Sequence, residues 1–304
     1  EPAEAEAPVE EVIEEHYEIT IKDPGDRLDI DSFAMTLIIV FINDEMGVEL
    51  DMETLDELDY ILDNFVINTE YSYGYPETKG YRGVIFSSSK GSFVVGANVK
   101  DFVDAHDAPD WEIDKILKKG QDIFNKIEDL NIPTVAIMKG ITMGGGLELA
   151  LACDRIYMLD EAGVEIQRST MNEGLLPMTT DITRSECRLL GEAELLESNQ
   201  GNYSRLNAPT AEQMGLVTEA LDEFDYEDMI PVAIEERVSL SPDSLTGMEA
   251  NLRFAGPENL ESKVFGRLSA WQNWIFIRPN ATGPHGALTL YGRPERPEFA
   301  WDRV

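Results

Sequence analysis

The spacing of hydrophobic and polar positions changes several times along the chain and predicts a series of strands and helices. Residues 17–21 alternate polar and apolar side chains, and residues 34–42 form an apolar run rich in β-branched side chains. Both patterns predict strands, which the turn residues 23–25 join so that they can pair as a hairpin. From residue 51 onward, apolar side chains recur at helical spacing and predict an amphipathic helix. These side chains are Leu55, Leu58, Ile61, Leu62 and Phe65.

The middle of the chain alternates predicted strands with predicted helices. The strands cover residues 83–87, 92–95, 134–138 and 155–159, and the helices cover residues 109–130 and 147–153. Strands that alternate with helices are typical of a parallel sheet whose strands are joined by crossover helices. The predicted fold class is therefore α/β.

Beyond residue 163 the pattern becomes mostly helical. Helices are predicted for residues 184–197, 211–215, 226–240, 245–254 and 261–276. The final stretch to residue 304 is rich in proline and arginine, and we expect it to wrap over a surface. The predicted organisation has three parts: a disordered acidic N-terminus (1–15), an α/β core (16–200) and a helical C-terminal region (201–304).

Composition narrows the classes of function. The 304 residues include 59 acidic and 24 basic side chains, which give a formal net charge of −35. Such a surface repels polyanions and argues against nucleic-acid binding. The excess of acidic residues is explained by solubility or by adaptation to high salt, and it does not indicate a particular function. Two cysteines favour a reducing, cytoplasmic location and offer no zinc site. We expect no membrane helix, which needs about 20 apolar residues, and no signal peptide in residues 1–15.

The segment 132–154 carries the most specific chemical signal. A buried strand leads into three successive glycines, Gly144, Gly145 and Gly146, and Glu148 follows at the start of a helix. Glycines let the backbone approach a ligand closely, and the free N–H groups of a first helical turn point at it. This arrangement suits an oxyanion hole, although glycine-rich turns also bind phosphate or simply permit tight packing.

A second segment supplies the context for the glycine-rich turn. Residues 92–102 read Ser-Phe-Val-Val-Gly-Ala-Asn-Val-Lys-Asp-Phe, and together with Gly-Gly-Gly-Leu-Glu-Leu-Ala-Leu-Ala-Cys-Asp they resemble the crotonase (enoyl-CoA hydratase/isomerase) superfamily. The resemblance implies a ββα spiral core and a thioester oxygen held between the backbone N–H groups of Ala97 and Gly145. Such donors stabilise the enolate by several kcal/mol. Glu148 then matches the first catalytic glutamate. Its alternative role is a solvated acid that complements the helix dipole.

The same resemblance extends to substrate binding. It places Gly96, Asn98, Gly144 and Gly146 beside the acyl-CoA. Coenzyme A enters only as part of the substrate, and no other cofactor or metal is expected. Its phosphates need basic partners, for which Lys90 and Lys100 are candidates, although an isolated lysine is more often a plain solvated charge. By resemblance we also expect a homo-oligomer.

The C-terminal segments 233–259 and 261–283 resemble the end of the benzoyl-CoA-dihydrodiol lyases, and residues 44–50 and 96–98 resemble their front half. The resemblance implies aromatic-compound degradation: water opens the ring of 2,3-epoxybenzoyl-CoA, and one carbon leaves as formate. Those lyases are much longer and carry two crotonase-like halves. For Trp271 and Trp274 we favour core or oligomer packing over substrate contact.

The chain departs from the hydratases at their second glutamate. That acid stands four residues before the glycine of a Gly-x-x-Pro turn, and here Gly174 begins the turn while Thr170 holds the position. A threonine cannot serve as a carboxylate base. We retain Thr170 as a substrate-binding residue. Glu173 is a second candidate catalytic acid, although surface charge is the more common explanation for such a residue.

Three functions follow as hypotheses. The first is a carbon–carbon lyase or hydrolase acting on a CoA thioester, with Glu148 as acid/base. The second is an enoyl-CoA hydratase or isomerase. The third is a non-catalytic crotonase-fold binding protein, which Thr170 favours.

Overall fold

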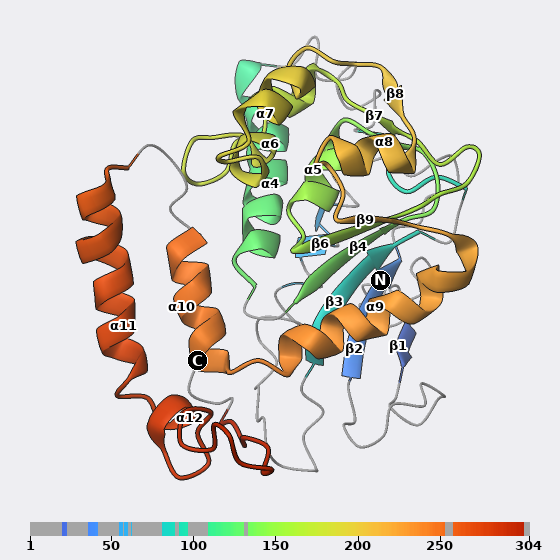
Figure 1. Cartoon of the computed structure of the whole chain (residues 1–304). Coiled ribbons are helices and arrows are strands. Elements are labelled where there is room, and N and C mark those ends of the chain that lie inside the picture. Colours follow the sequence, from blue (N-terminus) through green and yellow to red (C-terminus); the bar gives the residue numbers. More distant parts are fainter. Residues whose placement is uncertain are drawn as a thin grey trace, which may run out of the picture. The chain divides into compact units, whose positions relative to one another are not determined.

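The structure is a computed structural model of the chain (Figure 1). It describes residues 20–22, 36–41, 55–56, 58–59, 62, 81–88, 91–96, 109–130, 133–252 and 258–300. The chain divides into two compact units, one formed by Glu1–Asn68 with Tyr81–Ile230 and the other by Thr69–Gly80 with Pro231–Val304. The first unit thus extends to residue 230, beyond the boundary near residue 200 that the sequence suggested. The predicted disordered N-terminus, residues 1–15, lies outside the described residues.

A six-stranded sheet forms the centre of the first unit, with the order β1-β2-β3-β4-β6-β9 (Figure 1). Its strands are β1 (Thr20–Lys22), β2 (Thr36–Phe41), β3 (Tyr81–Ser87), β4 (Thr134–Met138), β6 (Arg155–Leu159) and β9 (Glu219–Leu221). β1 pairs antiparallel with β2, as the hairpin prediction requires, and the remaining neighbours are parallel. All five residues of β4 are buried, which explains why it reads as a continuous apolar run. The predicted α/β class is confirmed.

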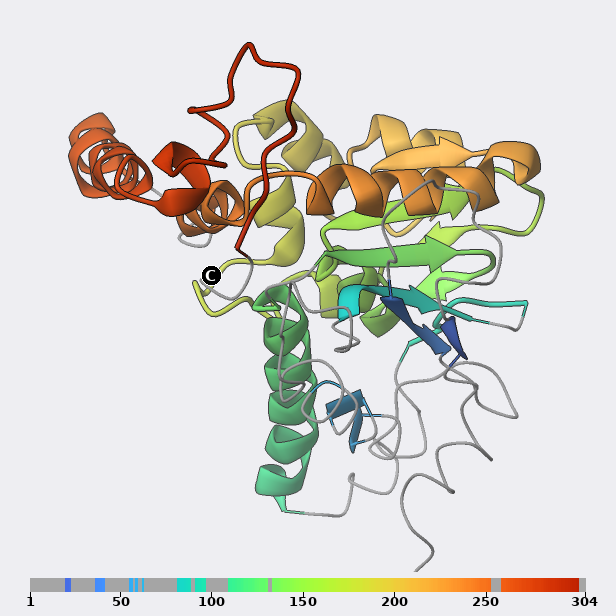
Figure 2. The same cartoon turned by 90° about the horizontal axis from the view of Figure 1, so that it is seen from below.

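Figure 2 shows β3, β4 and β6 side by side, together with the long helix α4 (Asp110–Glu128). Ile123, Phe124 and Ile127 of α4 are fully buried, and their spacing gives one apolar helical stripe. Leu55, Leu58 and Leu62, from the predicted amphipathic helix, are buried as well. The core of this unit therefore consists of the sheet and the apolar faces of its helices.

A second, three-stranded sheet has the order β5-β7-β8 and lies next to the short helix α5 (Gly145–Leu151). Its strands are β5 (Thr142–Met143), β7 (Ile166–Gln167) and β8 (Arg205–Leu206). Residues 92–95 were expected to form a strand, but they make only one isolated parallel bridge, between Ser92 and Ile141. Gly91 and Gly96 flank this segment, and glycines shorten a strand because they lack a side chain to pack.

Helices follow in the later part of the chain, as predicted. They are η3 (Thr170–Asn172), α6 (Arg184–Arg188), α7 (Ala193–Asn199), α8 (Ala208–Gln213), α9 (Glu223–Val238), α10 (Pro242–Leu252), η4 (Ser262–Leu268), α11 (Ser269–Ile275) and α12 (Pro279–Thr282). The single helix expected over 184–197 is two helices, because Gly191 adopts φ +95° between them. None of the helices in the described ranges has the length and apolar character that a membrane crossing requires.

Candidate active site

The glycine-rich turn between β5 and α5 has a backbone that only glycine tolerates. Gly144 adopts φ +48° and ψ −111°, which a side chain would make strained. A Cβ atom on Gly146 would lie 2.2 Å from the carbonyl oxygen of Val94. The glycines therefore bring the start of α5 into direct contact with the segment 91–96.

That segment runs alongside the turn. The Phe93 N–H donates to the Ile141 carbonyl at 2.9 Å, and the Met143 N–H donates to the Val94 carbonyl at 2.8 Å. A Cβ atom on Gly96 would lie 3.9 Å from the Met143 carbonyl oxygen. Gly96 is thus beside the glycine-rich turn, and its role in substrate binding stays a prediction. Ala97, Asn98, Lys90 and Lys100 lie outside the described residues.

Gly145 is the first residue of α5, and its N–H lies ahead of the first hydrogen bond within that helix. Among the residues that the structure describes, no group accepts a hydrogen bond from it. The Leu147 and Glu148 N–H groups, in contrast, both donate to the Gly144 carbonyl, at 3.0 and 3.2 Å. Gly145 therefore retains a backbone donor at the turn.

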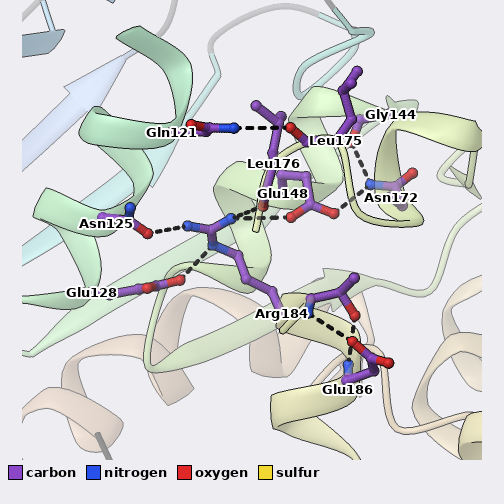
Figure 3. A network of polar contacts seen from close by, with 11 residues as sticks. Gln121, Asn125, Glu128, Gly144, Glu148, Asn172, Leu175, Leu176, Arg184 and Glu186 are labelled. Carbon is purple, nitrogen blue, oxygen red and sulfur yellow. Dashed lines mark hydrogen bonds and ion pairs between the residues drawn. The ribbon is translucent and has the colours of Figure 1, made fainter. Parts of the chain in front are cut away.

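Glu148 is a buried carboxyl group with both oxygens engaged (Figure 3). The Asn172 side-chain amide donates to Oε1 at 2.8 Å, and the Arg184 guanidinium donates to Oε2 at 3.3 Å. Burial raises the pKa of Glu148, and these two partners oppose the rise. A carboxylate has about four acceptor positions, so this bonding leaves capacity for a further proton or ligand.

Asn172 connects Glu148 to the glycine-rich turn. Its amide also donates to the Gly144 carbonyl at 2.9 Å, and its own carbonyl accepts from the Ser169 N–H at 2.9 Å. The Ser169 hydroxyl in turn caps η3. The capped turn thus fixes the amide that orients the Glu148 carboxyl.

Arg184 is the centre of a buried polar network at the start of α6 (Figure 3). Besides Glu148, its guanidinium forms an ion pair with Glu128 and donates to Asn125 Oδ1 at 3.0 Å and to the Leu176 carbonyl at 2.7 Å. Burial raises the pKa of Glu128 to about 7, and the charge of Arg184 limits the rise. One cation therefore compensates the half-buried carboxyl group of Glu128 on α4 and the buried one of Glu148 on α5.

Glu173, the second candidate acid, is exposed and already bound. Its carboxylate accepts from the Tyr203 hydroxyl at 2.6 Å and from the Gly201 N–H at 2.9 Å. These hydrogen bonds lower the pKa of Glu173, so the carboxylate form is favoured. Thr170 is exposed at the first position of η3. The catalytic role of Glu173 and the substrate-binding role of Thr170 stay predictions.

The two tryptophans lie in the second unit. A Cβ atom on Gly247 would lie 1.1 Å from the indole nitrogen of Trp271, so α10 and α11 pack closely there. The Arg278 guanidinium lies 4.7 Å from the centre of the Trp274 ring. Both observations agree with packing rather than substrate contact.

Sequence reasoning missed Asn172, Arg184, Asn125 and Glu128. The Ser-x-x-Asn spacing of residues 169–172 is a capping signal that predicts the turn, but not the bond from Asn172 to Glu148. The other three residues stand on the polar positions of helices, where charged side chains are usually solvated. No sequence signal distinguishes them.

The fold and the buried carboxyl beside a glycine-rich turn define a crotonase-type protein, and the comparisons with known proteins agree. The family model described as enoyl-CoA hydratase/isomerase matches residues 70–266, and the chain belongs to this family. Among solved structures, an enoyl-CoA hydratase from Polaromonas sp. JS666 has a TM-score of 0.69 with 15% identity, over 93% of this chain and 99% of that one. An enoyl-CoA hydratase/isomerase from Marinobacter aquaeolei has a TM-score of 0.67 with 18% identity, over 95% and 99%.

Two curated relatives are similar to about half of this chain. A benzoyl-CoA-dihydrodiol lyase from Aromatoleum evansii is 47% identical over 161 residues, which are 52% of this chain and 29% of the relative. A fatty acid oxidation complex subunit alpha from Idiomarina loihiensis is 34% identical over 169 residues, 54% of this chain and 22% of the relative. The matches thus span less than a third of either relative.

Proposed function

We propose that the protein is a carbon–carbon lyase of aromatic degradation that opens the ring of 2,3-epoxybenzoyl-CoA and releases formate. Membership of the enoyl-CoA hydratase/isomerase family supports a CoA thioester as the substrate. The 47% identity to a benzoyl-CoA-dihydrodiol lyase supports the particular reaction. The single structural observation that carries the proposal is the buried carboxyl of Glu148 beside a backbone turn with a free N–H at Gly145.

The proposed reaction balances without an oxidant or a reductant. Two molecules of water add to the seven-carbon acyl group, and one ring carbon leaves as formate with a proton, so that a six-carbon thioester bearing an aldehyde remains. Negative charge develops on the thioester oxygen whenever a carbon next to the carbonyl acts as a nucleophile or loses a proton. In the proposal the N–H groups of Ala97 and Gly145 stabilise this charge, and Glu148 transfers the proton.

The environment of Glu148 suits proton transfer. Burial raises its pKa, and an acid–base group works best when its pKa approaches the working pH. Asn172 and Arg184 hold the carboxyl in one orientation. Preorganisation of this kind avoids rearrangement during the reaction. Gly96, Asn98, Gly144, Gly146 and Thr170 would surround the acyl group, and Lys100 would meet the phosphates of coenzyme A.

The second candidate function is an enoyl-CoA hydratase or isomerase. The 34% identity to a fatty acid oxidation complex subunit favours it. The exposed Thr170 in place of a second buried acid argues against simple hydration, because that reaction benefits from one group that positions water and another that delivers the proton. A homo-oligomer is part of the proposal in either case.

The deciding experiment measures the products formed from 2,3-epoxybenzoyl-CoA and from short enoyl-CoAs. Formate release supports the lyase, and a hydrated or isomerised enoyl product supports the alternative. Binding without turnover of any thioester would indicate a non-catalytic binding protein.

Substitution then tests the role of Glu148. Glu148→Gln should lower kcat at least about a hundredfold, which is the contribution typical of general acid–base catalysis. The matched control is Glu128→Gln, which removes the other carboxyl paired with Arg184 but lies on α4. We expect the control to keep kcat within about tenfold. Equal losses in the two variants would assign the effect to the Arg184 network and would exclude Glu148 as the acid/base.

A further inference from the structure

Arg168 is a buried cation beside the glycine-rich turn to which the proposed mechanism gives no role. It lies between Gln167, the last residue of β7, and Ser169, the cap of η3. The Gly144 N–H donates to the Gln167 carbonyl at 3.2 Å, and the Ser169 hydroxyl lies 3.0 Å from the position of a Cβ on Gly144. The residues on both sides of Arg168 therefore contact the turn itself.

The Arg168 side chain is only 3% exposed. Its Nε and Nη1 atoms are buried, and neither has a hydrogen-bond partner among the residues that the structure describes. Within the same part of the chain, neither Glu148 nor Glu173 forms an ion pair with it, although both carboxylates act on its charge. In contrast, the buried Arg184 donates to three protein groups, and the half-buried Arg188 donates to two.

Burial of a guanidinium without partners is costly, and the cost is recovered only when an anion binds to it. The planar guanidinium can bind the two oxygens of a carboxylate in a bidentate way, which a spherical anion such as chloride cannot match. In a chain with a net charge of −35, a bound anion also requires a local cation to offset repulsion by the rest of the protein.

We propose that Arg168 is the carboxylate-binding residue of the acyl site and holds the formate that the lyase reaction releases. This inference rests on the proposed function for the identity of the carboxylate. Arg168 contributes its unpartnered N–H groups. The ring carbon that is expelled becomes formate, an anion that forms next to this buried positive charge. No covalent bond to the protein is formed.

The test measures binding of sodium formate in the absence of any thioester, so that it does not depend on turnover. Saturation-transfer NMR of formate, with chloride as the competing anion at constant ionic strength, compares the parent protein with Arg168→Met and Arg168→Lys. The matched control is Arg205→Met. Arg205 is an exposed arginine on β8, the strand that pairs with β7, and it forms an ion pair with Glu165. We expect formate to bind at least about tenfold more weakly to Arg168→Met, with Arg168→Lys in between and Arg205→Met unchanged.

The melting temperature provides a second readout that separates binding from folding. Formate should raise the melting temperature of the parent, because a ligand stabilises the state that binds it, and should have no effect on Arg168→Met. Arg168→Met itself should melt no lower than the parent, since it removes an unpaired buried charge. Equal formate binding in parent and Arg168→Met, or chloride competing as strongly as formate, would overturn the inference. Formate binding through Arg168 in a protein that releases no formate from 2,3-epoxybenzoyl-CoA would instead refute the proposed function alone.

Discussion

Replacement of Arg184 by glutamine should destabilise the protein by an amount that depends on pH. The side chain is 2% exposed and joins the carboxyl groups of Glu128 and Glu148 to neutral acceptors on Asn125 and Leu176 (Figure 3). Glutamine is too short and too weak a donor to replace a guanidinium with four such partners. Its introduction therefore leaves the buried Glu148 and the half-buried Glu128 without their paired cation.

The magnitude follows from the ionisation of these carboxyl groups. Removal of one partner from a buried ion pair typically costs about 3–5 kcal/mol, because the remaining charge is uncompensated. The cost is larger at about pH 8, because Glu128, with a pKa of about 7, is ionised in the parent there and loses its pairing with Arg184 in the variant. At about pH 5.5, below its pKa, Glu128 takes up a proton and becomes neutral, so the loss of its cationic partner should cost less, about 1–3 kcal/mol.

Urea unfolding followed by circular dichroism, at these two pH values, measures both losses. The matched control is Arg188→Gln on the same helix. Within the described residues Arg188 donates to neutral acceptors, the Gly215 carbonyl at 2.7 Å and the Thr218 hydroxyl at 3.2 Å. Its loss should be about 1–2 kcal/mol and should not change with pH. A loss for Arg184→Gln that is the same at both pH values would refute the reasoning that the arginine compensates two charges.

Two further predictions concern single groups near the site. The pKa of Glu128 is raised from 4.5 to about 7 in the folded protein, so the folded state holds the proton over this range. The free energy of unfolding should therefore fall by about 3 kcal/mol as the pH rises from about 4.5 to 7. Glu128→Gln should flatten this pH dependence in urea unfolding, and an unchanged slope would contradict the raised pKa. Gly146→Ala should lower the free energy of unfolding by about 1–3 kcal/mol and disturb turnover, since its Cβ would lie 2.2 Å from the Val94 carbonyl oxygen. Gly266→Ala is the control and should be neutral, because no atom lies within 4 Å of the new Cβ. Equal melting temperatures for the two variants would count against a close approach of Gly146 to Val94.

The regular elements that the sequence predicts well are those whose pattern is long and clearly bounded. β4 and β6 match their predicted ranges, 134–138 and 155–159, to the residue. Each is a nearly continuous buried run, which is typical of a parallel strand covered on both faces. The helix predicted over 109–130 corresponds to α4, since its nineteen residues give the helical period several turns in which to appear.

Short strands and breaks within helices could not be predicted, for physical reasons. β5, β7 and β8 have two residues each, too few for any period to be visible, and they exist because tertiary contacts bring them together. β9 (Glu219–Leu221) lies between two predicted helices and joins the main sheet beside β6, a long-range pairing that no local pattern encodes. Gly191 splits a predicted helix because its backbone adopts the left-handed region.

In the candidate site, too, residues close together in the sequence could be predicted, whereas distant ones could not. Gly144, Gly145, Gly146 and Glu148 are close in sequence, so one motif could place them together. Arg184 reaches Glu148 from 36 residues further along the chain, and in the sequence it has the same appearance as an exposed arginine at a helix start. Only the structure distinguishes the buried Arg184 from an exposed arginine, because burial depends on which surfaces meet and not on the residue type.

The replacement of the second hydratase glutamate by Thr170 changes the balance of charge near the site. Where hydratases carry a second acid, this chain has an exposed threonine, and the nearest alternative acid, Glu173, is bound to Tyr203 at the surface. The buried charge closest in sequence to that position is instead positive, at Arg168. A pair of carboxylates would repel an anionic product, whereas one carboxyl and one guanidinium attract it. The exchange of charge therefore favours, within our proposal, a reaction that expels a carboxylate over one that adds neutral water to a double bond.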